Sequence, residues 1–428
     1  MRAKLLILAS AIGSLGWGAV LPYQYAYAAD TRGWGALTAA GASSLFSLGA
    51  LVASPLAGRL ADRFNPVAVT VVAQLFGAVA VGSLMFVQSP VPFLLGMLAF
   101  GLGLSASVPA KQVLALQWSS SGDRRKVFAY KFTGESLGMA AGAFLAGLVV
   151  DLGRPDGLAA GFLMAGAGFV ISSALIAVAG WLPAQVAAGA ELESPDFPDE
   201  APGSGRGALR TIFATPAMRW TAVLTIALAL GFYAQFESGL PAYALTVLHA
   251  EPSVIGTAAA VNCLVIVALQ LVVVRLTAKR SAPVLLMAVG GVWVLSWLIL
   301  STAQFLPGVA PALFVLTYGV FAVGETVYSP VLSPLTASLA PAGMVGQTLG
   351  VVGALQTAFS AAGPLIAGLL LGSGLGDVFL GMHLAFSVLA IVAAWRIRGL
   401  LRGKSTVMDD AAGPAAVAPS TGRDAVTA

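Results

Sequence analysis

The sequence predicts an all-α integral membrane protein whose twelve transmembrane helices form two pseudo-symmetric six-helix bundles. Three observations support this prediction. Of the 428 residues, 58% are hydrophobic and 9% are charged, whereas an average soluble domain carries roughly a quarter charged residues. The apolar residues form runs long enough to cross a bilayer, which takes about 20 residues each. The first six runs also resemble the last six.

The apolar runs divide the chain into two bundles, a linker and a tail. Residues 1–182 hold six runs, which begin near Leu5, Gly35, Val67, Pro92, Phe128 and Leu158. Residues 183–219 are polar, acidic and proline-containing, so we expect a cytoplasmic linker there. Residues 220–400 hold six more runs, which begin near Trp220, Val254, Ala282, Pro311, Thr348 and Val378. Residues 401–428 are rich in Ala, Gly, Pro and Ser, and we expect a disordered cytoplasmic tail.

The basic residues indicate how the chain is oriented. Cytoplasmic loops of membrane proteins carry an excess of Lys and Arg. If the N-terminus is cytoplasmic, only Arg32 and Arg154 of the 22 Lys and Arg residues fall in loops on the opposite side, while Lys111 and Lys131 lie near cytoplasmic helix ends. We therefore expect a multi-pass protein of the cell membrane with both termini in the cytoplasm.

The two halves share a nearly constant register. Residues 140–148, AAGAFLAGL, match residues 361–369, AAGPLIAGL, which corresponds to an offset of 363 − 142 = 221. The same offset relates Pro109 to Pro330. Two such repeats imply a substrate path at their interface and alternating access by rocking of one half against the other.

Several classes of function are disfavoured by the composition. The basic residues are dispersed between apolar runs, which argues against nucleic-acid binding. No GxxxxGK[ST] loop occurs, which argues against ATP as the energy source. The one cysteine, Cys263, lies in an apolar run, and His, Cys and Asp do not cluster, so we expect no metal and no cofactor. A membrane enzyme or a sensor is the disfavoured alternative, because no catalytic constellation is recognisable.

A loop between the second and third spans carries a family resemblance. It reads GRLADRFNP over residues 58–66 and resembles the loop signature of the major facilitator superfamily, with Gly58, Asp62 and Arg63 at matching positions. Asn65 replaces the second glycine of that signature, and the final basic pair is absent. The resemblance implies that Asp62 contacts the N-terminal end of the eleventh span and latches the outward-facing state. Alternatively, Asp62 and Arg63 only anchor the loop at the interface.

Further segments resemble the drug:proton antiporter branch of that superfamily. They are residues 233–241, Asn262 with Gln270, and Gly324-Glu325 with Pro330.

The chain departs from that branch at two places. The branch usually carries an arginine in span four, four residues before a glycine, and Met97 stands there. Its usual Gly-Pro pair in span five is missing, because Ala143 follows Gly142, and the pair occurs in span eleven as Gly363-Pro364.

Three glycines of span five, Gly134, Gly138 and Gly142, follow a four-residue spacing that lets helices approach closely. We expect helix packing there and at Gly363 and Pro364.

Three carboxylates lie inside the spans, and each must face a wet cavity, pair with a cation or be protonated. Glu325, deep in span ten, is the leading candidate for a proton carrier; the alternative is a glutamate that only stabilises the bundle through hydrogen bonds. Glu237, in span seven, is a candidate for proton carriage or for substrate contact. Glu135 follows Lys131 by four residues, so the two can pair on one helix face. That pair either replaces the missing arginine relay or is a plain ion pair.

Aromatic and amide side chains in the spans suit a cavity for bulky amphipathic solutes. The candidates are Trp17, Tyr23, Gln24, Tyr233, Gln235, Asn262, Gln270, Tyr318 and Tyr328.

The resemblance and these residues together indicate a secondary active transporter, not an enzyme. The leading interpretation is proton-coupled multidrug efflux by alternating access, with antibiotic resistance as its consequence. The alternative is an importer or facilitator of a metabolite, favoured if Lys111 and Lys131 face the cavity and bind an anion. The expected partners are the lipid bilayer, a small-molecule substrate and protons, and we expect a monomer.

Overall fold

A computed structural model describes residues 1–120, 122–182, 206–236 and 239–411, and their regular secondary structure is helical throughout. Twelve helical spans in these residues are long and apolar enough to cross a membrane. The prediction of an all-α membrane protein with twelve transmembrane helices is therefore confirmed. Many large apolar side chains on the spans are exposed, as expected of surfaces that face lipid.

The first bundle contains six long helices. They are α1 (Arg2–Ala26), α2 (Gly35–Arg63), α3 (Pro66–Ser83), α4 (Pro90–Gln117), α5 (Arg124–Val149) and α6 (Ala159–Trp181). A π-helical turn, Tyr27–Thr31, extends α1.

The second bundle is more interrupted. Its elements are α7 (Arg206–Ile212), α8 (Pro216–Leu228), a π-helical turn (Ala229–Tyr233), α9 (Ala234–Phe236), α10 (Gly239–Thr246), α11 (Pro252–Thr277), α12 (Ala282–Ala303), α13 (Ala310–Ser338), α14 (Val345–Ala361), α15 (Gly363–Gly372) and α16 (Gly376–Ala411). The seventh span comprises α8, the π turn and α9, and the eleventh comprises α14 and α15.

The break in the eleventh span has a local cause. Pro364 occupies the first turn of α15, where its missing N–H needs no partner, and it cannot continue the hydrogen bonding of α14. Gly363 packs on the backbone of Ala234 so closely that a Cβ at this position would overlap the Ala234 carbonyl. The Gly-Pro pair therefore combines a helix break with a close contact between the eleventh and seventh spans.

The helices extend beyond two predicted boundaries. The span after the linker begins at Pro216 rather than Trp220, because the Thr215 hydroxyl accepts a hydrogen bond from the Met218 N–H and caps α8. The last helix continues to Ala411, so residues 401–411, for which the sequence suggested a disordered tail, are helical. Extending an existing helix is far easier than nucleating one, and this segment contains no proline. Residues 412–428 and most of the linker lie outside the described residues.

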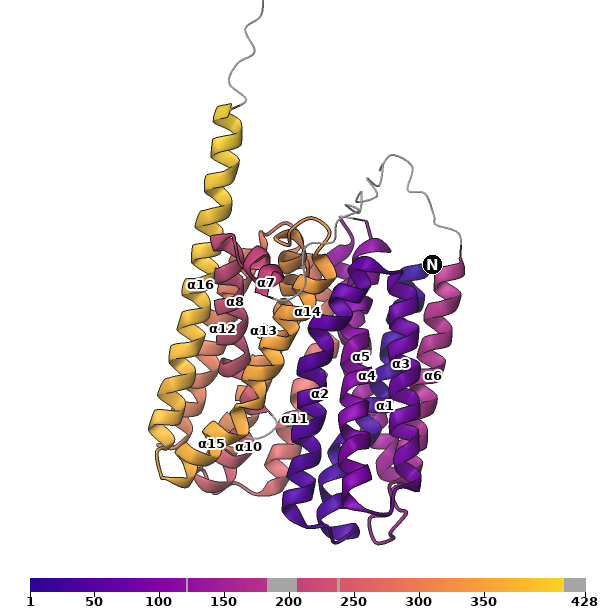
Figure 1. Ribbon diagram of the computed structural model, residues 1–428. Coiled ribbons are helices and arrows are strands. Elements are labelled where there is room, and N and C mark those ends of the chain that lie inside the picture. Colours follow the sequence, from indigo (N-terminus) through magenta and orange to yellow (C-terminus); the bar gives the residue numbers. More distant parts are fainter. Residues whose placement is uncertain (121, 183–205, 237–238, 412–428) are drawn as a thin grey trace, which may run out of the picture.

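Figure 1 shows α1–α6 on one side of the molecule and the helices from α7 onward on the other. The N-terminus and the end of α16 lie at the same end, which we call the terminal side. The large core of the second bundle includes Trp293, Trp297 and Phe321, and the first bundle has a core around Phe93 and Phe162. A small cluster made of Ala61, Ala110, Val113 and Leu349 joins the two bundles.

Candidate functional site

The two bundles are joined on the terminal side by Asp62, at the end of α2. Its Oδ1 accepts a hydrogen bond from the Gly346 N–H at 2.5 Å, and its Oδ2 accepts one from the Gln347 N–H at 2.6 Å. These N–H groups belong to the first turn of α14, which has no helical partners for them and carries the positive end of the helix dipole. The contact that the family resemblance implies for Asp62 is therefore present.

The other residues of this loop have different surroundings. Gly58 packs on Gly346 so closely that a Cβ would overlap the Gly346 carbonyl. Asn65, which replaces a glycine of the signature, caps α3, because its Oδ1 accepts a hydrogen bond from the Val67 N–H at 2.9 Å. Arg63 is exposed, with its guanidinium 5.8 Å from the Phe64 ring centroid.

Arg125 forms a second link between the bundles. From the start of α5 it donates hydrogen bonds to the carbonyl oxygens of Arg280 at 2.7 Å, Thr277 at 3.2 Å and Ala278 at 3.4 Å. These carbonyls lie at the C-terminal end of α11, where a cation is favourable. This role is not evident from the sequence, in which only the basic run Arg124-Arg125-Lys126 marks the start of the helix. The neighbouring Asp123 accepts a hydrogen bond from Lys126, which lowers the pKa of Asp123 and keeps it ionised.

A third link joins residues at corresponding positions of the two halves. Gln112, near the end of α4, donates a hydrogen bond to the Ser333 hydroxyl, near the end of α13, at 3.5 Å. The hydrogen bonds that join the bundles within the described residues thus lie near the terminal ends of the helices. The terminal side is therefore closed.

Glu325 lies near the middle of α13 and is 6% exposed. Its Oε2 accepts a hydrogen bond from the Asn262 Nδ2 of α11 at 2.9 Å, and the same Nδ2 lies 3.3 Å from the Tyr318 carbonyl oxygen. Within the described residues, no Lys, Arg or His forms an ion pair with Glu325. Glu325 is thus a buried carboxylate with an amide donor and, as far as the described residues go, without a cationic partner.

Two tyrosines, Tyr233 and Tyr328, lie close enough to Glu325 to interact with it electrostatically. The rings of Tyr233 and Tyr328 lie 5.5 Å apart, and that of Trp293 lies 6.0 Å from Tyr328. The Tyr328 hydroxyl donates to the Gln356 Oε1 at 3.3 Å, which joins α13 to α14. Among the described residues, we find no hydrogen bond between Tyr328 and Glu325.

The remaining cavity candidates of the second bundle hold helices together. Gln235 donates to the Gly363 carbonyl at 3.5 Å, Gln270 donates to the Thr326 carbonyl at 3.1 Å, and Tyr318 donates to the Phe236 carbonyl at 2.9 Å. All three residues are at most 1% exposed in this conformation. The Oε1 atoms of Gln235 and Gln270 are nevertheless buried without a partner within the described residues.

The cavity candidates of span one differ in their hydrogen bonding. Tyr23 donates to the Ala143 carbonyl at 2.7 Å, and Gln24 donates to the Ser43 hydroxyl at 3.1 Å. The indole N–H of Trp17 is buried, and we find no hydrogen-bond acceptor for it within the described residues.

Glu237, the candidate of span seven, lies outside the described residues.

A basic group lies inside the first bundle. Lys131 Nζ forms an ion pair with Glu135 Oε1 at 2.7 Å, and these side chains are 9% and 27% exposed. Lys111 of α4 is 4% exposed, close enough to interact electrostatically with both, and has no hydrogen-bond acceptor within the described residues. When all three groups are charged, one positive charge remains uncompensated.

The span-five glycines lie against α1. Gly138 and Gly142 pack on the backbones of Ala11 and Leu15 so closely that a Cβ would overlap their carbonyls, and Gly134 faces the Ala11 side chain.

No group of three or more His, Cys, Asp or Glu side chains suited to a metal ion occurs in the part of the chain that the structure describes.

Comparison with known proteins identifies the family. The sequence pattern of the Major Facilitator Superfamily matches residues 6–364. A segment of 105 residues is 31% identical to the multidrug resistance protein MdtG of Klebsiella pneumoniae (strain 342), and this covers 24% of the present chain and 25% of MdtG. The chain thus matches about a quarter of the length of that relative.

Solved structures with low sequence identity share the fold. A bacterial homologue of the iron transporter ferroportin in its outward-facing state has a TM-score of 0.75 and 16% identity, over 93% of this chain and 100% of that one. The human organic anion transporter MFSD10 (TETRAN) has a TM-score of 0.67 and 17% identity, over 92% and 98%. FucP in its outward conformation has a TM-score of 0.68 and 14% identity, over 93% and 98%. The protein therefore belongs to the Major Facilitator Superfamily and is a membrane transporter, not an enzyme.

Proposed function

We propose that this transporter exports drug-like or hydrophobic small molecules in exchange for protons, by alternating access. The observation that carries the proposal is Glu325, which is 6% exposed, accepts a hydrogen bond from Asn262, and has no cationic partner within the described residues. An ionised carboxylate in the middle of a membrane helix costs a few kcal/mol unless it is compensated. Proton uptake removes this cost, so burial itself makes Glu325 a proton acceptor.

The arrangement of the bundles fits one step of such a cycle. If the terminal side faces the cytoplasm, the hydrogen bonds of Asp62, Arg125 and Gln112 close the cytoplasmic side. Two of the similar solved structures are also outward-facing. In this state a proton from outside neutralises Glu325 and favours release of the solute. The neutral carrier then opens toward the cytoplasm, where loss of the proton and binding of the next solute are coupled.

The aromatic side chains near Glu325 support a bulky apolar solute. Tyr233 and Tyr328 lie close enough to Glu325 to interact with it electrostatically, and aromatic rings beside a carboxylate suit hydrophobic compounds, including organic cations. The segment similar to the multidrug resistance protein MdtG points in the same direction. We place the transporter in the cell membrane as a monomer with both termini in the cytoplasm, and antibiotic resistance is the expected phenotype.

The proposal is tested with Glu325→Gln, which keeps the side-chain shape and an oxygen that can accept from Asn262. Purified protein in liposomes is given an inward proton gradient, and efflux of ethidium is measured with and without a protonophore. We expect wild-type efflux to collapse with the protonophore. The variant should lose gradient-driven efflux and keep downhill exchange of ethidium. Asp156→Asn, which changes an exposed carboxylate, is the matched control. Undiminished gradient-driven efflux in Glu325→Gln would remove the carboxylate from the mechanism.

The buried basic group supports a second candidate function, the transport of an organic anion. Lys111 is buried and has no hydrogen-bond acceptor in the part of the chain that the structure describes, and Glu135 balances one of the two lysines. A carboxylate or phosphate on the solute would compensate the remaining charge. Uptake of a fluorescent organic anion that is lost in Lys111→Met, with ethidium transport absent, would favour this function over drug export.

A further inference from the structure

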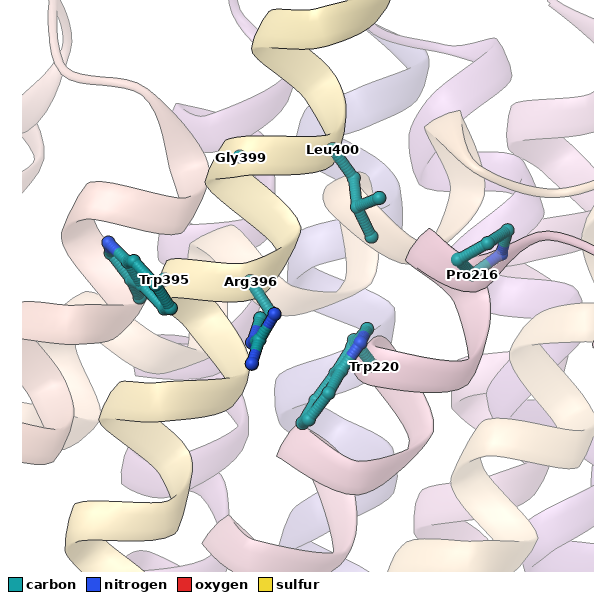
Figure 2. A pocket seen from close by; sticks show the side chains of 6 residues that line it. All are labelled: Pro216, Trp220, Trp395, Arg396, Gly399 and Leu400. Atoms are coloured by element: carbon teal, nitrogen blue, oxygen red, sulfur yellow. The ribbon is translucent and has the colours of Figure 1, made fainter.

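We propose that the transporter binds the headgroup of an anionic phospholipid in a groove between α8 and α16 on the terminal side. This inference is independent of the transported solute. The groove has a volume of about 290 Å³ and is lined by Pro216, Trp220, Trp395, Arg396, Gly399 and Leu400. Figure 2 shows the Arg396 side chain between the two indole rings, where it faces Trp220 across the gap between the helices.

The Arg396 guanidinium lies at the centre of this groove, next to two aromatic rings. The Arg396 guanidinium carbon lies 5.3 Å from the ring centroid of Trp395 and 5.8 Å from that of Trp220. Arg396 is exposed, and no hydrogen bond or ion pair engages its guanidinium within the described residues. Stacking on indole orients a guanidinium and leaves its N–H donors available, and a phosphate accepts from such a planar donor with two oxygens.

The surrounding charge is positive. The two elements that form the groove carry further arginines, namely Arg219 on α8 and Arg398 and Arg402 on the span Gly376–Arg402. Neither α7 nor α8 contains an acidic residue, and α16 contains none from Val378 to Arg402. Such a region attracts anionic headgroups on the cytoplasmic face of a membrane and offers nothing to a cationic one.

The depth of the groove matches the headgroup region. Trp220 follows the start of its span by four residues and Arg396 precedes the end of its span by six, which puts them roughly 6 and 9 Å inside the span ends at a rise of 1.5 Å per residue. Tryptophan is enriched at this level of the bilayer. Trp220 and Leu400 supply apolar surface beside the cation, as a lipid requires and a free phosphate ion does not.

The experiment measures lipid retention by native mass spectrometry of the full-length protein, released from nanodiscs of phosphatidylglycerol and phosphatidylcholine. We expect one phosphatidylglycerol to be retained by the wild type. Arg396→Gln should reduce retention at least about fivefold, and Trp220→Leu should reduce it as well. Arg398→Gln removes the same charge from the same helix, two residues away and on a different face, and should retain the lipid.

Equal losses in Arg396→Gln and Arg398→Gln would mean diffuse attraction of lipid and would overturn the site. Equal retention of phosphatidylcholine would overturn the requirement for an anionic headgroup. Release of bound phosphatidylglycerol by millimolar inorganic phosphate would show a free-anion site instead. Unchanged retention in all variants would also refute the proposal. Circular dichroism spectra check that each variant is folded.

Discussion

Gln112 and Ser333 form a hydrogen bond of 3.5 Å across the bundle interface, and their numbers differ by 221, which is the offset that relates the two halves of the sequence. Two corresponding residues can touch only close to the axis that relates their halves. The pair therefore lies near that axis, at the terminal ends of α4 and α13. It reports directly on whether this end of the transporter is open or closed.

Covalent linkage of this pair should stop transport. In a Cys263→Ser background, the double variant Gln112→Cys/Ser333→Cys should form a disulfide on mild oxidation in the closed state. Because alternating access requires this end to separate, oxidation should abolish ethidium transport and a reductant should restore it. Each single cysteine variant serves as a control and should be insensitive to oxidation. Full transport by the oxidised, cross-linked protein would contradict closure at this interface.

Asp62→Asn should open the terminal side more often. The amide keeps one oxygen but turns an N–H toward the first turn of α14, so one of the two hydrogen bonds to Gly346 and Gln347 is lost, together with the charge. A hydrogen bond to a charged group contributes about 1.5–3 kcal/mol, which corresponds to a tenfold to hundredfold shift in the population of the closed state. The rate at which a maleimide labels Ser333→Cys should rise accordingly.

The control for this prediction is Asp123→Asn, which lies at the same end of the molecule and whose carboxylate, among the described residues, binds Ser120 and Lys126 of its own bundle. It should leave the labelling rate unchanged. If Asp62→Asn is labelled at the same rate as the protein with Asp62 intact, the carboxylate does not stabilise the closed conformation.

The sequence predicted the architecture because the bilayer makes long apolar helices obligatory and easy to recognise. It predicted the partner of Asp62 only through a family resemblance, since residues 62 and 346 are far apart in the chain. The links through Arg125 and Gln112 were not foreseen, because a basic or amide residue at a helix end has the same appearance whether it faces water or another bundle. Polar residues inside spans stand out in the sequence, but the sequence could not distinguish Glu325 and Asn262, which pair with each other, from Gln235 and Tyr318, which join helices.

Gly138→Val should destabilise the first bundle. A Cβ at Gly138 would overlap the Ala11 carbonyl of α1, which belongs to the backbone and cannot move aside without shifting the helix. Overpacking of this kind costs about 1–3 kcal/mol, so the midpoint of thermal unfolding in detergent should fall. Gly381→Val is the matched control, because a Cβ at Gly381 meets no atom within 4 Å. Equal midpoints for the two variants would mean that α1 and α5 are not closely packed.

The ion pair of Lys131 and Glu135 is tested by a double-mutant cycle. Glu135→Gln alone leaves Lys131 and Lys111 buried without a carboxylate and should lower stability by up to about 3 kcal/mol, whereas Lys131→Met alone leaves Glu135 beside Lys111 and should cost less. The double variant Lys131→Met/Glu135→Gln should recover part of the loss seen in Glu135→Gln, because only one of the two lysine charges then remains. Unfolding midpoints measure the coupling, and proton-driven ethidium efflux of the double variant decides its role. A plain ion pair predicts a stable and active double variant, whereas a proton relay predicts a stable protein that still exchanges ethidium downhill but no longer responds to the proton gradient.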